Sequence, residues 1–327
     1  PPPPKKRRWV QYIFGFVGVV CVYVLIVATL MERTIRISNI TEQKQETVWQ
    51  RIAGIFGSTK INKETPPDPN PIPADDPNRI NILILGIRGE DQPEEGGLLT
   101  DTIMILTVDK KSGRTALISI PRDLSVDMLS VHGKINQMYE RGYPKGKGVA
   151  LAREVVSRLT GQYIDHAIVF DFKAFQHIVD NIGGVDVKLA KPFTENQQWG
   201  YEFNLPAGDN HLTGEQALYY VRSRYSSSDF DRARRQQEVI GAIRKKVISL
   251  DMLTSPGKIT ALFTTLKGDI KTDYQVWEFN DAIELARSIN FDSIKRYVLD
   301  TSNLLYETHN DKGEYILLPT EGTYDRI

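Results

Sequence analysis

The sequence predicts an α/β domain built in layers, together with one membrane-spanning helix near its N-terminus. Short, continuously apolar runs rich in β-branched residues alternate along the chain with longer segments of helical spacing, and this alternation predicts the layered domain. A run of roughly 23 uncharged residues ahead of the domain predicts the spanning helix.

The composition limits the classes of function that need to be considered. With 327 residues, of which 41% are hydrophobic, the chain can bury the core of one large domain and carry appendages. Lys and Arg together number 41, as do Asp and Glu, so we expect no nucleic-acid partner, and any anion site must come from local clustering. Cys21 is the only cysteine, which excludes disulfides within the chain and cysteine-rich metal sites.

The spanning helix is predicted for Trp9–Met31, which is long enough to cross a hydrocarbon core of about 30 Å. Residues 1–8 end in four basic side chains, which predicts a cytoplasmic N-terminus, a single pass through the cell membrane and a main domain outside it. A cleaved signal peptide is the alternative, but the apolar run is too long and no small-x-small cleavage site follows. A buried core helix is a second alternative, which apolar residues on every face disfavour.

The segment 32–78 is predicted to be a polar stalk that ends in a proline-rich linker, Pro66–Asn78. The main domain is expected at 79–250. Residues 251–327 are interpreted as a C-terminal extension of the same domain, with no role assigned.

Within the domain, three apolar runs predict buried strands: Ile80–Ile87, Thr102–Asp109 and Thr115–Ile120. Helical spacing of apolar residues predicts four helices: Val149–Leu159, Phe172–Ile182, Gly214–Val221 and Asp229–Leu250. Further strand-like runs are HAIVFDF (166–172), VDVKL (185–189), KRYVLD (295–300) and EYILLP (314–319). The tail also holds two helix-like segments, Pro256–Leu266 and Asn280–Ile289.

The strongest local signal is an arginine-rich cluster at the start of the long predicted helix, YVRSRYSSSDFDRARRQQ (220–237). Asp229, Arg232 and Gln236 have the spacing i, i+3 and i+7, so they share one helix face. The same face continues as an apolar stripe through Val239 and Ile243, so the polar groups are expected to face inward.

Inward-facing guanidinium groups beside a helix N-terminus are suited to a multiply charged anion such as diphosphate. If Tyr220–Tyr225 is extended, Arg222 and Arg224 point the same way and add to this site. A structural network of ion pairs is the alternative interpretation of the same residues.

Two other positions at strand ends are candidates for the site. Arg122 follows the predicted strand Thr115–Ile120, where ligands bind in open α/β sheets, although a structural pair with Asp123 is the alternative. Asp101 precedes the strand at Thr102 and is suited either to capping a turn or to holding a hard cation. Lys134 and Asn136 add a weaker signal.

Seven motifs follow one another between Arg79 and Ser249: NILILGI, LTDTIMIL, SIPRD, KINQMY, DNIGGVDV, LTGEQALYYVRSRY and DFDRARRQQ. Through these motifs and their order, this part of the chain resembles the LytR-CpsA-Psr family.

The resemblance implies a central mixed β-sheet flanked by helices, and an apolar tunnel that holds a polyprenyl tail with its diphosphate at the mouth. It implies magnesium-assisted phosphotransfer, in which a glycopolymer moves from a polyprenyl-diphosphate carrier to peptidoglycan outside the membrane. The implied diphosphate ligands are Arg122, Arg222, Arg224, Arg232 and Gln236. Asp229 would orient its arginine neighbours, Asp101 would bind Mg²⁺, and Arg122 and Asp101 would be the catalytic residues.

The chain departs from the family pattern beside the implied metal site. Arg88 stands where the family usually has an aspartate, and Leu99 stands where it usually has an arginine. We therefore expect Mg²⁺ to be held by Asp101 together with phosphate oxygens of the donor and water. Two alternatives share most of these residues: a polyprenyl-diphosphate hydrolase, and a non-catalytic lipid-binding regulator or scaffold of the envelope.

Overall fold

The computed structural model describes residues 71–250, except 92, 94, 95, 129 and 130, together with 270–273, 285, 294–324 and 327. All of these lie in one compact unit, Asp68–Ile327. The predicted spanning helix, the stalk and the predicted helix Pro256–Leu266 lie outside the described residues. Of the predicted helix Asn280–Ile289 only Leu285 is described, and it is helical. No helix in the described part of the chain combines the length and the apolar character that a bilayer crossing requires.

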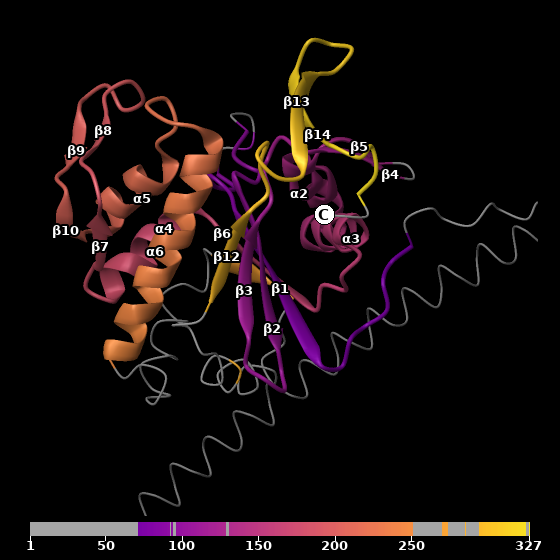
Figure 1. Ribbon diagram of the computed structural model, residues 1–327, viewed down its shortest axis with the longest axis horizontal. Coiled ribbons are helices and arrows are strands. Elements are labelled where there is room, and N and C mark those ends of the chain that lie inside the picture. Colours follow the sequence, from indigo (N-terminus) through magenta and orange to yellow (C-terminus); the bar gives the residue numbers. More distant parts are fainter. Residues whose placement is uncertain are drawn as a thin grey trace, which may run out of the picture. The chain divides into compact units, whose positions relative to one another are not determined.

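A mixed sheet stands at the centre of the domain, as the resemblance implied (Figure 1). Its strand order in the described residues is β11-β6-β1-β2-β3-β12. The first three strands in sequence form an antiparallel meander, whereas β6 pairs in parallel with β1 and β12 pairs in parallel with β3. The strands span Arg79–Gly86 (β1), Thr102–Asp109 (β2), Thr115–Ser119 (β3), His166–Phe170 (β6), Ile270–Thr272 (β11) and Lys295–Val298 (β12).

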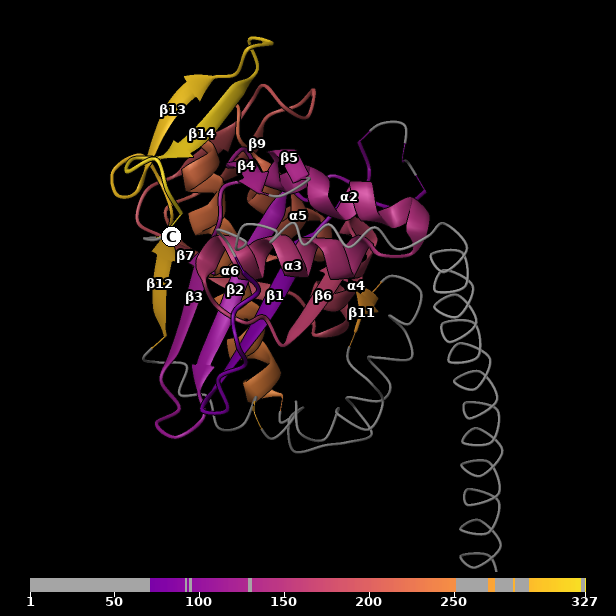
Figure 2. The same ribbon diagram turned by 90° about the vertical axis from the view of Figure 1, so that its right-hand side faces the viewer.

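Helices cover both faces of this sheet (Figures 1 and 2). One face carries α2 and α3, and the other carries α4, α5 and α6. The four helices predicted from apolar spacing are confirmed, each within one residue at either end. The helices span Met138–Gly142 (α2), Gly148–Thr160 (α3), Phe172–Asn181 (α4), Gly214–Arg222 (α5) and Asp229–Ser249 (α6).

The described residues also form four two-stranded antiparallel sheets outside the central sheet, and only β7 and β14 among their strands were predicted. They are β4 (Ser125–Met128) with β5 (Val131–Lys134), β7 (Val185–Leu189) with β10 (Gly208–Leu212), β8 (Phe193–Glu195) with β9 (Phe203–Leu205), and β13 (Leu305–His309) with β14 (Tyr315–Pro319). Short 3-10 helices precede and follow α2: η2 (Ile135–Gln137) and η3 (Tyr143–Lys145). The backbone N–H of Leu317 in β14 donates to the carbonyl of Asp123, which joins the last hairpin to the segment between β3 and β4.

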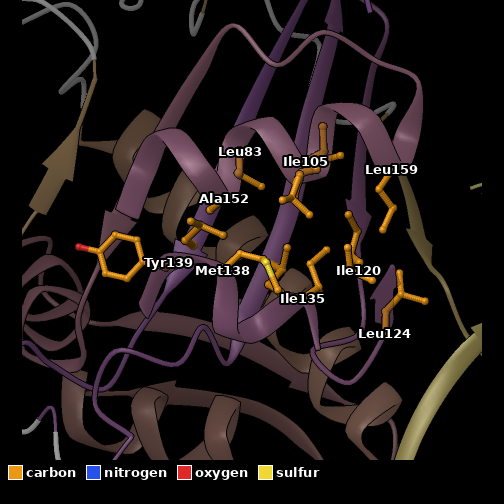
Figure 3. Close-up of a cluster of buried hydrophobic side chains, with 14 of the residues drawn as sticks. Leu83, Ile105, Ile120, Leu124, Ile135, Met138, Tyr139, Ala152 and Leu159 are labelled. Carbon is orange, nitrogen blue, oxygen red and sulfur yellow. The ribbon is translucent and has the colours of Figure 1, made fainter. Parts of the chain in front are cut away.

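Two apolar cores hold the layers together. The first lies between the sheet and the layer of α2 and α3, where Leu83, Met138 and Leu159 are buried among aliphatic neighbours (Figure 3). The second joins α4, α5 and α6 to β7 and β10, with Leu212 and Val239 fully buried. Because side chains alternate along a strand, the central strands present one set of residues to the first core and the other set to the helices of the second.

The first core predicts a stability effect. Leu83 is completely buried in β1, so Leu83→Ala should lower the free energy of unfolding by about 2–5 kcal/mol. Urea denaturation followed by circular dichroism measures it. Ile72→Ala is the control, because Ile72 is 50% exposed and its loss should change stability by no more than about 0.5 kcal/mol. Equal effects of the two substitutions would contradict the assigned core.

Candidate functional site

The ends of several strands meet at one edge of the sheet. β1 ends at Gly86, its parallel neighbour β6 ends at Phe170, and the antiparallel β2 begins opposite at Thr102. These three residues are paired side by side in the register. A Cβ atom on Gly86 would lie 2.9 Å from the Cβ of Thr102, so glycine keeps the end of this row open. Arg88 and Asp101 lie in the loop that joins β1 to β2 at the same edge.

A cavity of about 390 Å³ lies between this edge and the helices α4, α5 and α6. Part of its wall is apolar, and the side chains concerned are Phe170, Phe172, Phe175, Leu218, Val221 and Ile240. Other lining residues are charged or carry an amide: Arg88, Asp101, Arg122, Arg222, Arg224, Arg232, Gln198 and Gln236. Such a cavity is suited to an amphipathic ligand with a highly charged anionic group.

The structure brings the predicted diphosphate ligands and Asp101 to this cavity and places Asp229 beside Arg232. Asp101, the four predicted arginines and Gln236 line the cavity. Asp229 lies behind, with its Oδ1 3.4 Å from Nη1 of Arg232. Lys134 and Asn136 are not among the lining residues.

Helix α6 delivers its polar residues inward, as its spacing predicted. It begins after Ser228, whose hydroxyl accepts a hydrogen bond from the Asp231 N–H. Arg232 in the first turn is 6% exposed, and Gln236, one turn further along, is 8% exposed. Burial lowers the pKa of Arg232, and the charge of Asp229 opposes that shift.

The backbone that carries Arg222 and Arg224 does not have the extended conformation offered in the sequence analysis. The sequence allowed Tyr220–Tyr225 to be extended, and this is wrong, because α5 continues through Arg222. At the end of α5, the backbone N–H and the hydroxyl of Ser223 both donate hydrogen bonds to the carbonyl of Tyr219, which continues the helical pattern past Arg222. Arg224 lies in the following loop, and its backbone N–H donates to the Gln198 side chain at 2.9 Å.

The guanidinium of Arg222 is enclosed by aromatic rings. Its Cζ lies 4.0 Å from the centre of the Phe172 ring and 4.9 Å from that of Trp199. Burial, followed by the charge of Arg88, lowers the pKa of Arg222 to about 10. The group therefore stays cationic at neutral pH, and the rings hold it with cation–π contacts.

Arg235 holds the α5–α6 loop from behind. This arginine is 8% exposed and donates to the carbonyl oxygens of Tyr220 and Ser223 and to the hydroxyl of Ser227. Because these three acceptors flank Arg222 and Arg224 in sequence, Arg235 fixes the backbone that presents both side chains to the cavity.

Arg122 belongs to a chain of charges at the end of β3. Its Nη1 forms an ion pair with Asp101, and its Nε lies 3.8 Å from Oδ2 of Asp123. Lys134 donates to the other oxygen of Asp123 at 2.7 Å. The tight partner of Arg122 is therefore Asp101, which precedes it by 21 residues, and not its sequence neighbour.

The described residues fit a bound divalent cation poorly. Asp101 is the only acidic residue among those lining the cavity, and one of its oxygens is already paired with Arg122. The described part of the chain contains no group of three or more His, Cys, Asp or Glu side chains arranged to hold a metal. Hard cations bind through several oxygen ligands, whereas guanidinium groups repel them. The role of Asp101 toward Mg²⁺ stays a prediction.

Several lining residues were not selected as site residues from the sequence, among them Phe172, Gln198 and Trp199. Phe172 was placed in a predicted helix, where its spacing resembled that of a core residue. Gln198 and Trp199 lie in the loop between β8 and β9, which carries no periodic pattern. Arg88 was noticed only as a departure from the family pattern, and the available signal was a cation directly after the apolar run Ile80–Ile87.

Comparison with known proteins agrees with this fold and this set of motifs. The profile of the LytR_cpsA_psr family matches residues 30–324. The polyisoprenyl-teichoic acid–peptidoglycan teichoic acid transferase TagU of Enterococcus faecalis is 30% identical over 76% of this chain and 74% of its own length. The Bacillus mycoides protein of the same name is 34% identical over 59% of this chain, and the match spans 60% of that relative.

A solved structure shares the fold at lower identity. Bacillus subtilis TagV superposes with a TM-score of 0.59 at 23% identity, over 76% of this chain and 94% of TagV. Together with the profile that covers most of the sequence, this fold shows that the chain belongs to the LytR-CpsA-Psr family.

Proposed function

We propose that this protein transfers a glycopolymer from a polyprenyl-diphosphate carrier to peptidoglycan. The observation that carries the proposal is one cavity in which an apolar wall meets five arginines. A polyprenyl diphosphate has the matching composition, since an apolar chain adjoins two phosphate groups. The transferase names of the relatives from Enterococcus faecalis and Bacillus mycoides support the same reaction class.

The diphosphate would be bound by the guanidinium groups of Arg122, Arg222, Arg224 and Arg232, with the amide of Gln236 as a further donor. Planar guanidinium forks suit the paired oxygens of a phosphate group. Two of these cations are also restrained from behind, Arg122 by Asp101 and Arg232 by Asp229. Such restraint lowers the conformational entropy that binding would otherwise remove.

Transfer would then proceed by displacement at phosphorus. The acceptor hydroxyl oxygen forms a bond to the phosphorus that carries the glycopolymer, and the bond from that phosphorus to the bridging oxygen breaks. Polyprenyl monophosphate leaves with the electron pair, and the hydroxyl proton ends on this basic phosphate. The arginines neutralise the oxygen charge that moves toward the leaving group, which is the main contribution proteins make to phosphoryl transfer.

We also propose that the reaction takes place outside the cell membrane. The basic residues 5–8 and the uncharged run Trp9–Met31 support a single-pass anchor with a cytoplasmic N-terminus. This arrangement would bring the cavity near a lipid-linked donor in the outer leaflet and near peptidoglycan.

Single substitutions of the predicted diphosphate ligands test the binding site. Replacing Arg122, Arg222, Arg224 or Arg232 by alanine removes a charge-assisted contact worth about 1.5–3 kcal/mol, so affinity for farnesyl diphosphate should fall about 10- to 150-fold. Calorimetry measures the affinity, and circular dichroism checks the fold. Arg114→Ala is the matched control, because Arg114 is exposed and lies at the opposite end of β3. Unfolding of all four variants would instead support a structural ion-pair network.

A radiolabelled lipid-linked donor separates transfer from hydrolysis. With peptidoglycan oligomers present, label should appear on the oligomers, and Arg122→Ala should reduce the rate at least tenfold. Without oligomers, little water-soluble label should be released. Equal release with and without the acceptor would establish a hydrolase, and an unconsumed donor would favour a non-catalytic lipid-binding role.

A reporter that is active only outside the cytoplasm tests the orientation. Fused after Ile327, it should give full signal in cells, whereas neutralising Lys5, Lys6, Arg7 and Arg8 together should reduce that signal by weakening the retention of the N-terminus inside. Immunoblotting controls for abundance. A silent fusion of normal abundance would contradict the proposed topology.

A further inference from the structure

The charge inside the cavity is strongly unbalanced. Among the described residues that line it, five carry a positive charge and Asp101 alone carries a negative one. The positive residues are Arg88, Arg122, Arg222, Arg224 and Arg232. A wall of this composition attracts anions and opposes the entry of a divalent cation.

The single carboxylate is also engaged by protein groups. Its Oδ1 forms an ion pair with Arg122, and the backbone carbonyl of Asp101 accepts a hydrogen bond from Nη2 of Arg232 at 3.4 Å. A cation bound at Asp101 would have to share this carboxylate with one guanidinium and lie close to a second. Both neighbours would lower its affinity.

Backbone hydrogen bonds fix the position of Arg88 at the same site. It follows β1 by two residues, its N–H donates to the carbonyl of Gly97, and its own carbonyl accepts from the Phe172 N–H. These contacts fix Arg88 between the β1–β2 loop and the start of α4, whose Phe172 ring also packs against Arg222.

Arg88 and Arg222 line the same cavity. The charge of Arg88 is, after burial, the next largest cause of the lowered pKa of Arg222. An anion bound in a cavity that both guanidinium groups line interacts favourably with both positive charges. Their arrangement therefore favours a ligand with at least two negative charges.

We propose that Arg88 takes the place of a divalent cation in this protein: with Arg222 it neutralises the donor diphosphate, so that binding and transfer proceed without metal. This inference rests on the proposed function. In the displacement described above, Arg88 and Arg222 would neutralise the negative charge that develops on the leaving polyprenyl phosphate. The step requires no additional reactant. Guanidinium groups serve this purpose in other phosphoryl-transfer sites.

Calorimetry of the full-length protein in detergent with inorganic pyrophosphate provides the test. In EDTA the wild-type protein should bind pyrophosphate, and added Mg²⁺ should not improve affinity by more than about threefold. Arg88→Ala should weaken binding in EDTA by about 10- to 150-fold, and Arg88→Lys should restore part of it by returning a point charge. Loss of wild-type binding in EDTA would overturn the proposal, as would an unchanged affinity in Arg88→Ala.

Charge reversal gives a sharper readout. Arg88→Asp places a second carboxylate near Asp101, so Mg²⁺ should now improve pyrophosphate binding by about tenfold or more, because magnesium binds through carboxylates and phosphate oxygens together. Arg114→Asp, at the far end of β3, is the matched control and should show the wild-type response to metal. An Arg88→Asp variant that folds but gains no dependence on Mg²⁺ would contradict the assigned position of Arg88.

Calorimetry together with the radiolabelled donor assay distinguishes this inference from the proposed function. Metal-free pyrophosphate binding that depends on Arg88, with no consumption of the lipid-linked donor, would support the role of Arg88 in binding and refute the transferase, and with it the metal-free transfer. Donor transfer that occurs only with Mg²⁺ would support the transferase and refute the inference.

Discussion

Burial of a guanidinium group costs free energy unless its charge and its N–H donors are paired. Arg232 and Arg235 are both buried in this site, so their partners determine much of its structure. Arg235 satisfies its donors with two backbone carbonyls and the Ser227 hydroxyl, all from one segment of chain. Arg232 is partnered by Asp229 and by the carbonyl of Asp101. The first arginine therefore shapes the α5–α6 loop, and the second ties α6 to the edge of the sheet. Loss of either would leave buried acceptors or a buried charge unpaired.

The cavity follows from how the layers meet. At the edge of the sheet, Gly86 carries no side chain where a Cβ would contact Thr102, and the facing helices contribute Phe175 from α4 and Val221 from α5. The opening that remains is lined by aromatic and aliphatic side chains and by cations, and the Phe172 and Trp199 rings lie directly against Arg222. An amphipathic ligand is favoured because each part of the wall excludes the opposite part of the ligand.

The proposed metal-free site differs from a site built around a metal in how the diphosphate charge is neutralised. Asp101 holds Arg122 and so contributes to orienting an arginine. Arg88 adds a cation where a second carboxylate would be needed for magnesium, and its backbone is anchored to Gly97 and Phe172. Charge neutralisation by fixed guanidinium groups has a physical advantage, because no ion has to be captured before the donor binds.

The sequence by itself determined the elements of the main domain and the inward face of α6. Apolar runs located β1, β2 and β3, and helical spacing located the four long helices, because both patterns are local and reflect burial. The spacing of Asp229, Arg232 and Gln236 placed them on the core-facing side for the same reason. The short hairpins were mostly missed, since strands of three to five residues carry little periodic signal.

Only the tertiary structure decided which of these residues meet. Arg122 pairs with Asp101 across 21 residues of chain, although Asp123 is its neighbour. Trp199 packs on Arg222 from a loop without any pattern, and Arg88 joins the same cavity from the end of β1. These contacts depend on strand order and on the paths of loops. Local periodicity carries no information about either, because it records only how each segment faces its own surroundings.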